Sequence, residues 1–255
     1  MKKIAVLNDL SGMGKCSLTA AIPVISVMGI QACPLPTAVL SAQTGFPSYY
    51  CDDYTDRMDA IMEEWKKMDF HPDGIYTGFL ADARQADKAV EFIEQFAKED
   101  TKILIDPVMG DNGEEYPVYT EALCEKMRFL VRRATVITPN LTEALLLLYG
   151  TQRAHILWNE IALMNEERLL KFTESTGKEL SKEFDTEVVI TGIDLPVREN
   201  HQEIGNLICQ DGNTTWVTAA KEGGSYSGTG DLFASVLSAG MVKGIDTVDS
   251  VHRAV

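Results

Sequence analysis

The protein has 255 residues, of which 45% are hydrophobic, and its 38 acidic residues against 23 basic ones give a formal net charge of -15. This hydrophobic content is typical of a folded globular chain and excludes disorder as the main state. The acidic excess argues against a nucleic-acid partner and against an anionic membrane surface, because both need a clustered basic face.

Short apolar segments alternate with amphipathic ones along the chain. We expect buried strands at residues 4–7, 74–77, 102–105, 135–138 and 188–191, and helices over residues 17–28, 82–98, from 141 onward and within 154–178. Such alternation predicts an α/β fold with a mostly parallel central sheet covered by helices on both faces. In such sheets ligands bind at the carboxyl ends of the strands.

One segment departs from this rhythm. Residues 203–218 are extended in character around Asp211 and Gly212, which predicts a β-hairpin and therefore antiparallel strands at one edge of the sheet. There is no internal repeat and no linker rich in Pro, Gly or Ser. We therefore expect a single domain over residues 1–255.

The chain has no targeting or redox signature. No window reaches the roughly 20 uncharged apolar residues of a membrane span, and Asn8 and Asp9 interrupt the first apolar run too early for a signal peptide. The five cysteines are scattered and form no C-x-x-C pair, so neither a disulfide framework nor a zinc site is indicated. We expect a cytoplasmic protein with reduced thiols.

A glycine-bearing loop at residues 12–17 (GMGKCS) follows the first strand and looks like a phosphate-binding P-loop. The P-loop pattern G-x-x-x-x-G-K-[ST] fails here, because Asp9 stands at the position of the first glycine and Cys16 follows the lysine. The alternative is a loop whose glycines let the backbone approach a ligand.

A second glycine-rich segment, residues 223–231, opens directly into an apolar helix. Free backbone N–H groups and the positive end of a helix dipole would converge there on an anion such as a phosphoryl group. Asp231 lies in the first helical turn, where it can take the proton of an attacking hydroxyl. The alternative for Asp231 is an ordinary acidic residue favoured by the helix dipole.

Acidic and amide side chains follow two further strands. Asp106 and Asp111 come after the strand at 102–105, and Asn140 and Glu143 come after the strand at 135–138. Carboxylate oxygens are the ligands that Mg²⁺ prefers, directly or through its water shell. The alternative for Asn140 and Glu143 is a helix cap and its partner.

These motifs together resemble the pyridoxal kinases of the ribokinase superfamily. The resemblance rests on residues 106–111 (DPVMGD), 137–143 (ITPNLTE), 189–192 (VITG) and 228–231 (GTGD), and toward the N-terminus on residues 6–11 (VLNDLS), 38–46 (AVLSAQTGF) and 77–80 (TGFL). It covers essentially the whole chain. It implies a ribokinase-like three-layer α/β/α sandwich that uses ATP to phosphorylate the 5'-hydroxymethyl group of pyridoxal, pyridoxine or pyridoxamine.

The resemblance also implies roles for individual residues. Asp231 would be the base, and the N–H groups of Gly228, Thr229 and Gly230 would form the anion hole. The ring of the substrate would be bound by Ser11, Thr44 and Phe79, with Asp231 at its hydroxyl. ATP would be bound by Asp106, Thr138, Asn140, Glu143, Thr191, Gly192 and Thr229. Mg²⁺ would be held by Asp106, Asp111, Thr138 and Glu143, and a monovalent cation is an open addition.

Some positions depart from the family pattern. Leu10 and Gly12 stand where many pyridoxal kinases have glutamine and histidine, Gln43 replaces a frequent histidine, and Phe79 replaces a frequent tyrosine. The loop at residues 9–14 resembles that of hydroxymethylpyrimidine kinases, which usually carry Gly-Thr-Gly-Cys where this chain has Gly-Thr-Gly-Asp.

Two alternatives therefore stay open: a hydroxymethylpyrimidine kinase of thiamine synthesis, and a non-catalytic nucleotide- or vitamin-binding relative. Family members are often homodimers, so the resemblance implies a homodimer. The chain ends at Val255, earlier than family members usually do, which leaves open a missing final helix or a shortened chain.

Overall fold

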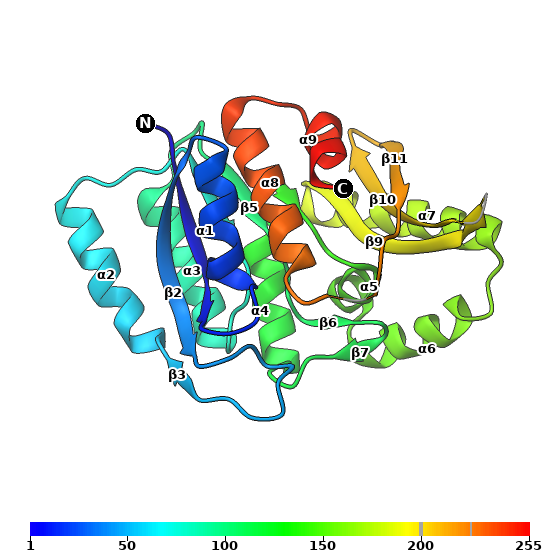
Figure 1. Ribbon diagram of the computed structural model, residues 1–255, viewed down its shortest axis with the longest axis horizontal. Coiled ribbons are helices and arrows are strands. Elements are labelled where there is room, and N and C mark those ends of the chain that lie inside the picture. Colours follow the sequence, from blue (N-terminus) through cyan, green and yellow to red (C-terminus); the bar gives the residue numbers. More distant parts are fainter. Residues whose placement is uncertain (199–200, 225) are drawn as a thin grey trace.

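The computed structural model describes residues 1–198, 201–224 and 226–255. Its main feature is a twisted sheet of nine strands in the order β11-β10-β9-β8-β5-β4-β1-β2-β3 (Figure 1). The strands span Lys3–Ser11 (β1), Gln31–Leu40 (β2), Cys51–Asp53 (β3), Gly74–Thr77 (β4), Lys102–Ile105 (β5), Val136–Ile137 (β8), Glu187–Arg198 (β9), His201–Gln210 (β10) and Asn213–Ala220 (β11). A separate two-stranded hairpin joins Gly110–Asp111 (β6) to Glu114–Glu115 (β7).

The six central strands of the sheet are parallel and its two edges are antiparallel. Strands β2, β1, β4, β5, β8 and β9 pair in parallel, whereas β10 and β11 on one edge and β3 on the other run antiparallel to their neighbours. The predicted hairpin is confirmed, with Asp211 and Gly212 both at positive φ (51° and 77°) in its turn. Two consecutive positive φ angles give a turn whose twist matches that of the flanking strands.

Helices cover both faces of the sheet. Figure 1 shows three of them in front of the sheet: Ser17–Val27 (α1), Thr229–Lys243 (α8) and Thr247–Ala254 (α9). The other face is covered by Thr55–Lys67 (α2), Ala83–Phe96 (α3), Glu121–Val131 (α4), Leu141–Tyr149 (α5), Thr151–Ile161 (α6) and Glu166–Phe184 (α7). The predicted three-layer α/β/α sandwich is therefore confirmed.

Strand β1 shows why both layers form. Its side chains alternate between the two cores: Ile4 and Val6 pack under α1 and α8, while Ala5 and Leu7 pack under the opposite helices. All four are fully buried, as expected for a parallel strand with helices on both sides. None of the helices in the described part of the chain has the length and apolar character needed to cross a membrane.

One expectation about this strand was wrong. We expected this strand to end at residue 7, but β1 continues to Ser11 and its pairing register with β2 shifts between Asn8 and Leu10. The extra residue lies on β2, since Pro36 and Val39 are three positions apart while Asn8 and Leu10 are two apart, and such bulges are common next to active sites. Three polar residues at the end of β1, Asn8, Asp9 and Ser11, are buried beside this irregularity.

Candidate active site

The candidate site lies where the parallel strands end and α8 begins, toward the bottom of Figure 1. Asn8 on β1, Tyr76 on β4 and Asp106 after β5 belong to the same alternating set as the residues that pack under α8. Because the carboxyl ends of parallel strands meet at one edge, residues up to 223 positions apart come into contact there.

The start of α8 is held against the loop that precedes α1. Gly228, at φ 89°, is the residue before the helix, and a Cβ atom there would lie 2.4 Å from the backbone oxygen of Lys15. Only glycine fits this close approach and this backbone conformation. The first N–H groups of the helix have no partner within it, and Thr229 and Gly230 are exposed, so these groups are open to a ligand.

Asp231 lies in the first turn of α8 and receives several hydrogen bonds. Its Oδ1 accepts from Asn8 Nδ2 at 3.0 Å and from the hydroxyl of Tyr76 at 3.3 Å. Burial raises the pKa of the Asp231 carboxyl, and the Ser17 backbone N–H and the Asn8 amide oppose this rise by stabilising the ionised form. The hydrogen bonds from Asn8, Tyr76 and Ser17 thus stabilise the ionised carboxylate, the form that can accept a proton.

Asp106 is a second buried carboxyl at this edge. Burial raises its pKa to about 7, the charge of Asp231 adds to the rise, and the hydrogen bond from Thr138 Oγ1 at 3.1 Å opposes it. Glu143 lies close enough for the charge of Asp106 to contribute to the raised pKa of its carboxyl, which comes mainly from burial. The structure therefore brings Asp106, Thr138, Glu143 and Asp231 together in an interior that carries excess negative charge.

The helix-cap interpretation of Asn140 and Glu143 is correct. Asn140 Oδ1 accepts from the N–H of Glu143 at 3.0 Å, and Glu143 Oε2 accepts from the N–H of Asn140 at 2.9 Å. Glu143 Oε1 accepts a further hydrogen bond from the N–H of Met109 at 3.1 Å. Both oxygens of this buried carboxylate thus fix the loop between β5 and β6 to the start of α5.

Asp111 is the exposed neighbour of this group, and its charge also contributes to the raised pKa of Glu143. It is exposed on the β6–β7 hairpin, and both of its oxygens accept hydrogen bonds from Asn112 at 2.9 Å. Across residues 1–198, 201–224 and 226–255, no three His, Cys, Asp or Glu side chains are grouped so that they could hold a metal ion. Of the four residues expected at Mg²⁺, Asp106, Thr138 and Glu143 are buried, whereas Asp111 is exposed on the hairpin beside Glu143.

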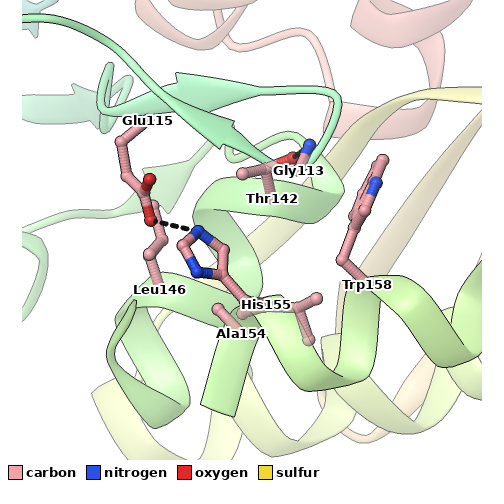
Figure 2. A pocket seen from close by; sticks show the side chains of 8 residues that line it. Gly113, Glu115, Thr142, Leu146, Ala154, His155 and Trp158 are labelled. Carbon is pink, nitrogen blue, oxygen red and sulfur yellow. Dashed lines mark hydrogen bonds and ion pairs between the residues drawn. The ribbon is translucent and has the colours of Figure 1, made fainter. Parts of the chain in front are cut away.

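The β6–β7 hairpin that carries Asp111 is held in place by α5 and α6. Figure 2 shows a small hollow between the hairpin and α6, where His155 Nε2 lies 2.8 Å from Glu115 Oε1 and the Trp158 ring stands beside Gly113. A Cβ atom on Gly113 would lie 2.2 Å from that ring. The Gly113 N–H also donates to Thr142 Oγ1 at 2.9 Å, so α5 and α6 both hold the hairpin.

The predicted ring-binding residues lie at the end of β1 and around it. Ser11 is buried and its hydroxyl donates to Asp9 Oδ2 at 2.7 Å. Phe79 is half-buried after β4, and Thr44 is exposed in the loop between β2 and β3. That loop meets the glycine loop through a hydrogen bond from Gln43 N to the Met13 carbonyl at 2.9 Å.

The predicted nucleotide residues Thr191 and Gly192 lie beside Asn140. The N–H of Thr191 donates to the Pro139 carbonyl at 2.9 Å, and Thr191 forms an isolated bridge with Asn140. Gly192 has φ 73°, and the space beside its Cα is open. Thr191 and Gly192 on β9 therefore lie next to the start of α5.

Comparison with known proteins agrees with this geometry. The family model described as phosphomethylpyrimidine kinase matches residues 14–255. The chain belongs to this kinase family.

Solved structures of similar proteins support the match. A candidate phosphomethylpyrimidine kinase from Bacteroides thetaiotaomicron, whose crystal form contains pyridoxal, is 39% identical to this chain, with a TM-score of 0.85. The match covers 99% of this chain and 84% of that one. The pyridoxal kinase of Lactobacillus plantarum is 25% identical with a TM-score of 0.84, over 100% of this chain and 85% of that one. The fold is shared with the Staphylococcus aureus pyridoxal kinase in complex with AMP-PCP and pyridoxal, at 20% identity, a TM-score of 0.79 and coverage of 100% and 85%.

Three site residues of this phosphomethylpyrimidine kinase family member have no role among the predictions from the sequence. Asn8 and Tyr76 contact Asp231, and Asp9 accepts the hydroxyl hydrogen bond of Ser11. One signal was available in the sequence: Asn8 and Asp9 interrupt the apolar run of the first strand. Polar residues at such positions are buried at a cost unless they have partners, so they point to a built network.

Proposed function

We propose that the protein transfers the γ-phosphoryl group of ATP to the 5'-hydroxymethyl group of pyridoxal, pyridoxine or pyridoxamine. The observation that carries the proposal is the half-buried, hydrogen-bonded carboxylate of Asp231 in the first turn of α8, next to N–H groups that are open to a ligand. The relative from Bacteroides thetaiotaomicron, crystallised with pyridoxal, and the pyridoxal kinase from Lactobacillus plantarum support the choice of substrate.

In the proposed reaction Asp231 accepts the proton of the ring alcohol as its oxygen bonds to phosphorus and the bond to ADP breaks. The N–H groups of Gly228, Thr229 and Gly230 stabilise the negative charge on the transferring group, which is where most catalytic power in phosphoryl transfer arises. Ser11, Thr44 and Phe79 position the ring, and Thr138, Asn140, Thr191 and Gly192 line the nucleotide side.

The donor set fits a divalent cation. Asp106 and Glu143 are buried carboxyls, and the charge of Asp231 raises the pKa of Asp106 while the charge of Asp106 raises that of Glu143, so a bound cation would relieve this repulsion. Asp106 and Thr138 would hold Mg²⁺, with Glu143 reached through its water shell. When bound, Mg²⁺ supplies positive charge to the phosphates of ATP.

The proposal is tested by kinetics with four alcohols: pyridoxal, pyridoxine, pyridoxamine and hydroxymethylpyrimidine. We expect the highest kcat/KM with a vitamin B6 alcohol. The family model favours the second candidate function, a phosphomethylpyrimidine kinase, and a higher kcat/KM for the pyrimidine would replace our substrate assignment.

The base assignment is tested with Asp231→Asn. We expect kcat to fall by about 10²-fold or more, because general-base catalysis contributes about 10²- to 10⁴-fold. Asp249→Asn is the matched control, since Asp249 also lies in the first turn of a helix but is exposed on α9. Unchanged turnover in Asp231→Asn would refute the assignment, and a wild type that phosphorylates no ring alcohol would favour a binding protein.

A further inference from the structure

Asn8 is fully buried on β1, and its side-chain amide has a fixed orientation. Its Oδ1 accepts hydrogen bonds from the backbone N–H of Phe79 at 2.9 Å and of Asp9 at 3.0 Å. A backbone N–H can only donate, so this atom is the amide oxygen and the other atom is the NH₂ group. The NH₂ group lies 3.0 Å from Asp231 Oδ1 and therefore donates to it.

The strand beside Asn8 leaves room for this arrangement. A Cβ atom on Gly78 would lie 2.3 Å from Asn8 Nδ2 and 2.6 Å from Asn8 Cγ. Any other residue at position 78 would displace the amide, because real Cβ contacts are never this short and the side chain is enclosed. The glycine in the Thr77-Gly78-Phe79 segment is thus explained by its contact with the amide that touches the base.

Tyr76 supplies a second donor to the same oxygen. Its side chain is fully buried on β4, and its hydroxyl lies 3.3 Å from Asp231 Oδ1. The charges of Asp231 and Asp106 and, above all, burial raise the pKa of this phenol well above its ordinary value, so it stays protonated and donates. Two donors from two strands restrain rotation of the carboxylate.

We propose that Asn8 and Tyr76 are positioning residues: they orient the Asp231 carboxylate toward the substrate hydroxyl and keep it ionised, and Asn8 couples it to the Phe79 segment of the ring site. The proposal rests on the function proposed above. The coupling follows from the geometry, because one amide bonds the backbone of Phe79 on one side and Asp231 on the other.

The titratable groups around Asp231 determine the sign of the expected pH effect. Asp9 on β1, Tyr76 on β4 and the carboxyl of Asp106 after β5 face it, and the thiol of Cys16 before α1 and the phenol of Tyr116 after β7 also interact with it. None of these is a cation. Loss of a donor therefore destabilises the ionised carboxylate, and the pKa of Asp231 rises.

The test compares Tyr76→Phe and Asn8→Ala with wild type and with Tyr119→Phe. Tyr119 is a matched control because its hydroxyl is hydrogen-bonded to Thr151, away from the site. We expect kcat to fall by about 10- to 100-fold in each site variant, the range for one lost hydrogen bond to a charged group. The acid limb of the kcat profile moves to higher pH while KM for ATP stays near that of wild type.

A second measurement does not depend on turnover. The pKa of Asp231, followed by carbon NMR of labelled aspartate carboxyls and assigned with Asp231→Asn, should rise in both site variants and stay unchanged in Tyr119→Phe. Tyr76→Phe removes only one oxygen, so it serves if Asn8→Ala does not fold.

The two proposals fail in different ways. A wild type without kinase activity refutes the proposed function, and the NMR titration then still tests the positioning. If Tyr76→Phe and Asn8→Ala both keep the kcat, the pH profile and the Asp231 pKa of wild type, the positioning proposal alone is refuted. This holds even if Asp231→Asn is inactive.

Discussion

At the scale of single residues, the buried carboxyls of the site show what a sequence can reveal and what it cannot. The position of Asp231 after Gly-Thr-Gly indicated a base beside an anion hole, and the structure brings it together with Asp106, Thr138 and Glu143. Asn8 and Tyr76 were not assigned a role, because a hydrogen bond across 223 or 155 positions depends on strand order. Spacing along the chain contains no such information.

A prediction about Mg²⁺ follows from Asp106. Its pKa of about 7 lies above the ordinary value of 3.8, so the folded protein binds this proton more tightly than the unfolded chain. The contribution of this carboxyl to stability is therefore greatest below about pH 4 and is lost as the pH rises through about 7. Mg²⁺ binds the ionised form and should raise the unfolding temperature more at pH 8 than at pH 6.

The check is thermal unfolding with and without Mg²⁺ at both pH values. Asp106→Asn should be more stable than wild type at pH 8 without the metal and should gain little from it. An equal gain from Mg²⁺ in the variant and in wild type would contradict a role for Asp106 in holding the cation.

At the scale of elements, the periodic segments were predicted and the irregular ones were not. The strands β4, β5, β8 and β9 and the β10–β11 hairpin begin within a few residues of their predicted positions. Strand β2 was missed because Pro34 and Pro36 argue against a central strand. Pro34 and Pro36 are two positions apart on β2, so they point the same way, and they pair with Val6 and Asn8 of β1. On its other side β2 pairs with β3 only at Ala38, Val39 and Leu40. The prolines therefore lie where β2 is an open edge, which tolerates them.

The contact between α8 and the loop before α1 gives a prediction at the same scale. Gly228→Ala places a methyl group 2.4 Å from the Lys15 oxygen at a φ that alanine rarely adopts. We expect a loss of about 1–3 kcal/mol in the free energy of unfolding, measured by denaturant titration, and a larger fractional loss of kcat. Gly224→Ala is the control, because the space beside Gly224 is open. Wild-type stability and kcat in Gly228→Ala would show that the close approach is not needed.

At the scale of the whole molecule, the charge of -15 argues against polyanionic surfaces as partners and yet is compatible with a polyphosphate as cosubstrate. The two kinds of partner differ in the area of protein surface that each must contact. A nucleic acid needs a wide basic face, whereas one nucleotide needs a few N–H groups and a cation at a single point. The layered fold could be predicted because alternating apolar segments determine it. The arrangement of the site depends on the register shift between β1 and β2 and on the order of the strands, and neither has a signature in the sequence.

Because Trp158 packs against Gly113, the fluorescence of Trp158 can report the position of the β6–β7 hairpin. The chain has three tryptophans, and Trp65 and Trp216 contact Phe70 and Glu174 at other places. In a Trp65→Phe, Trp216→Phe variant, the emission of Trp158 alone reports how close β6–β7 stays to α6. A spectral shift on addition of MgATP would show that the hairpin bearing Asp111 responds to the nucleotide, and an unchanged spectrum would show that it does not.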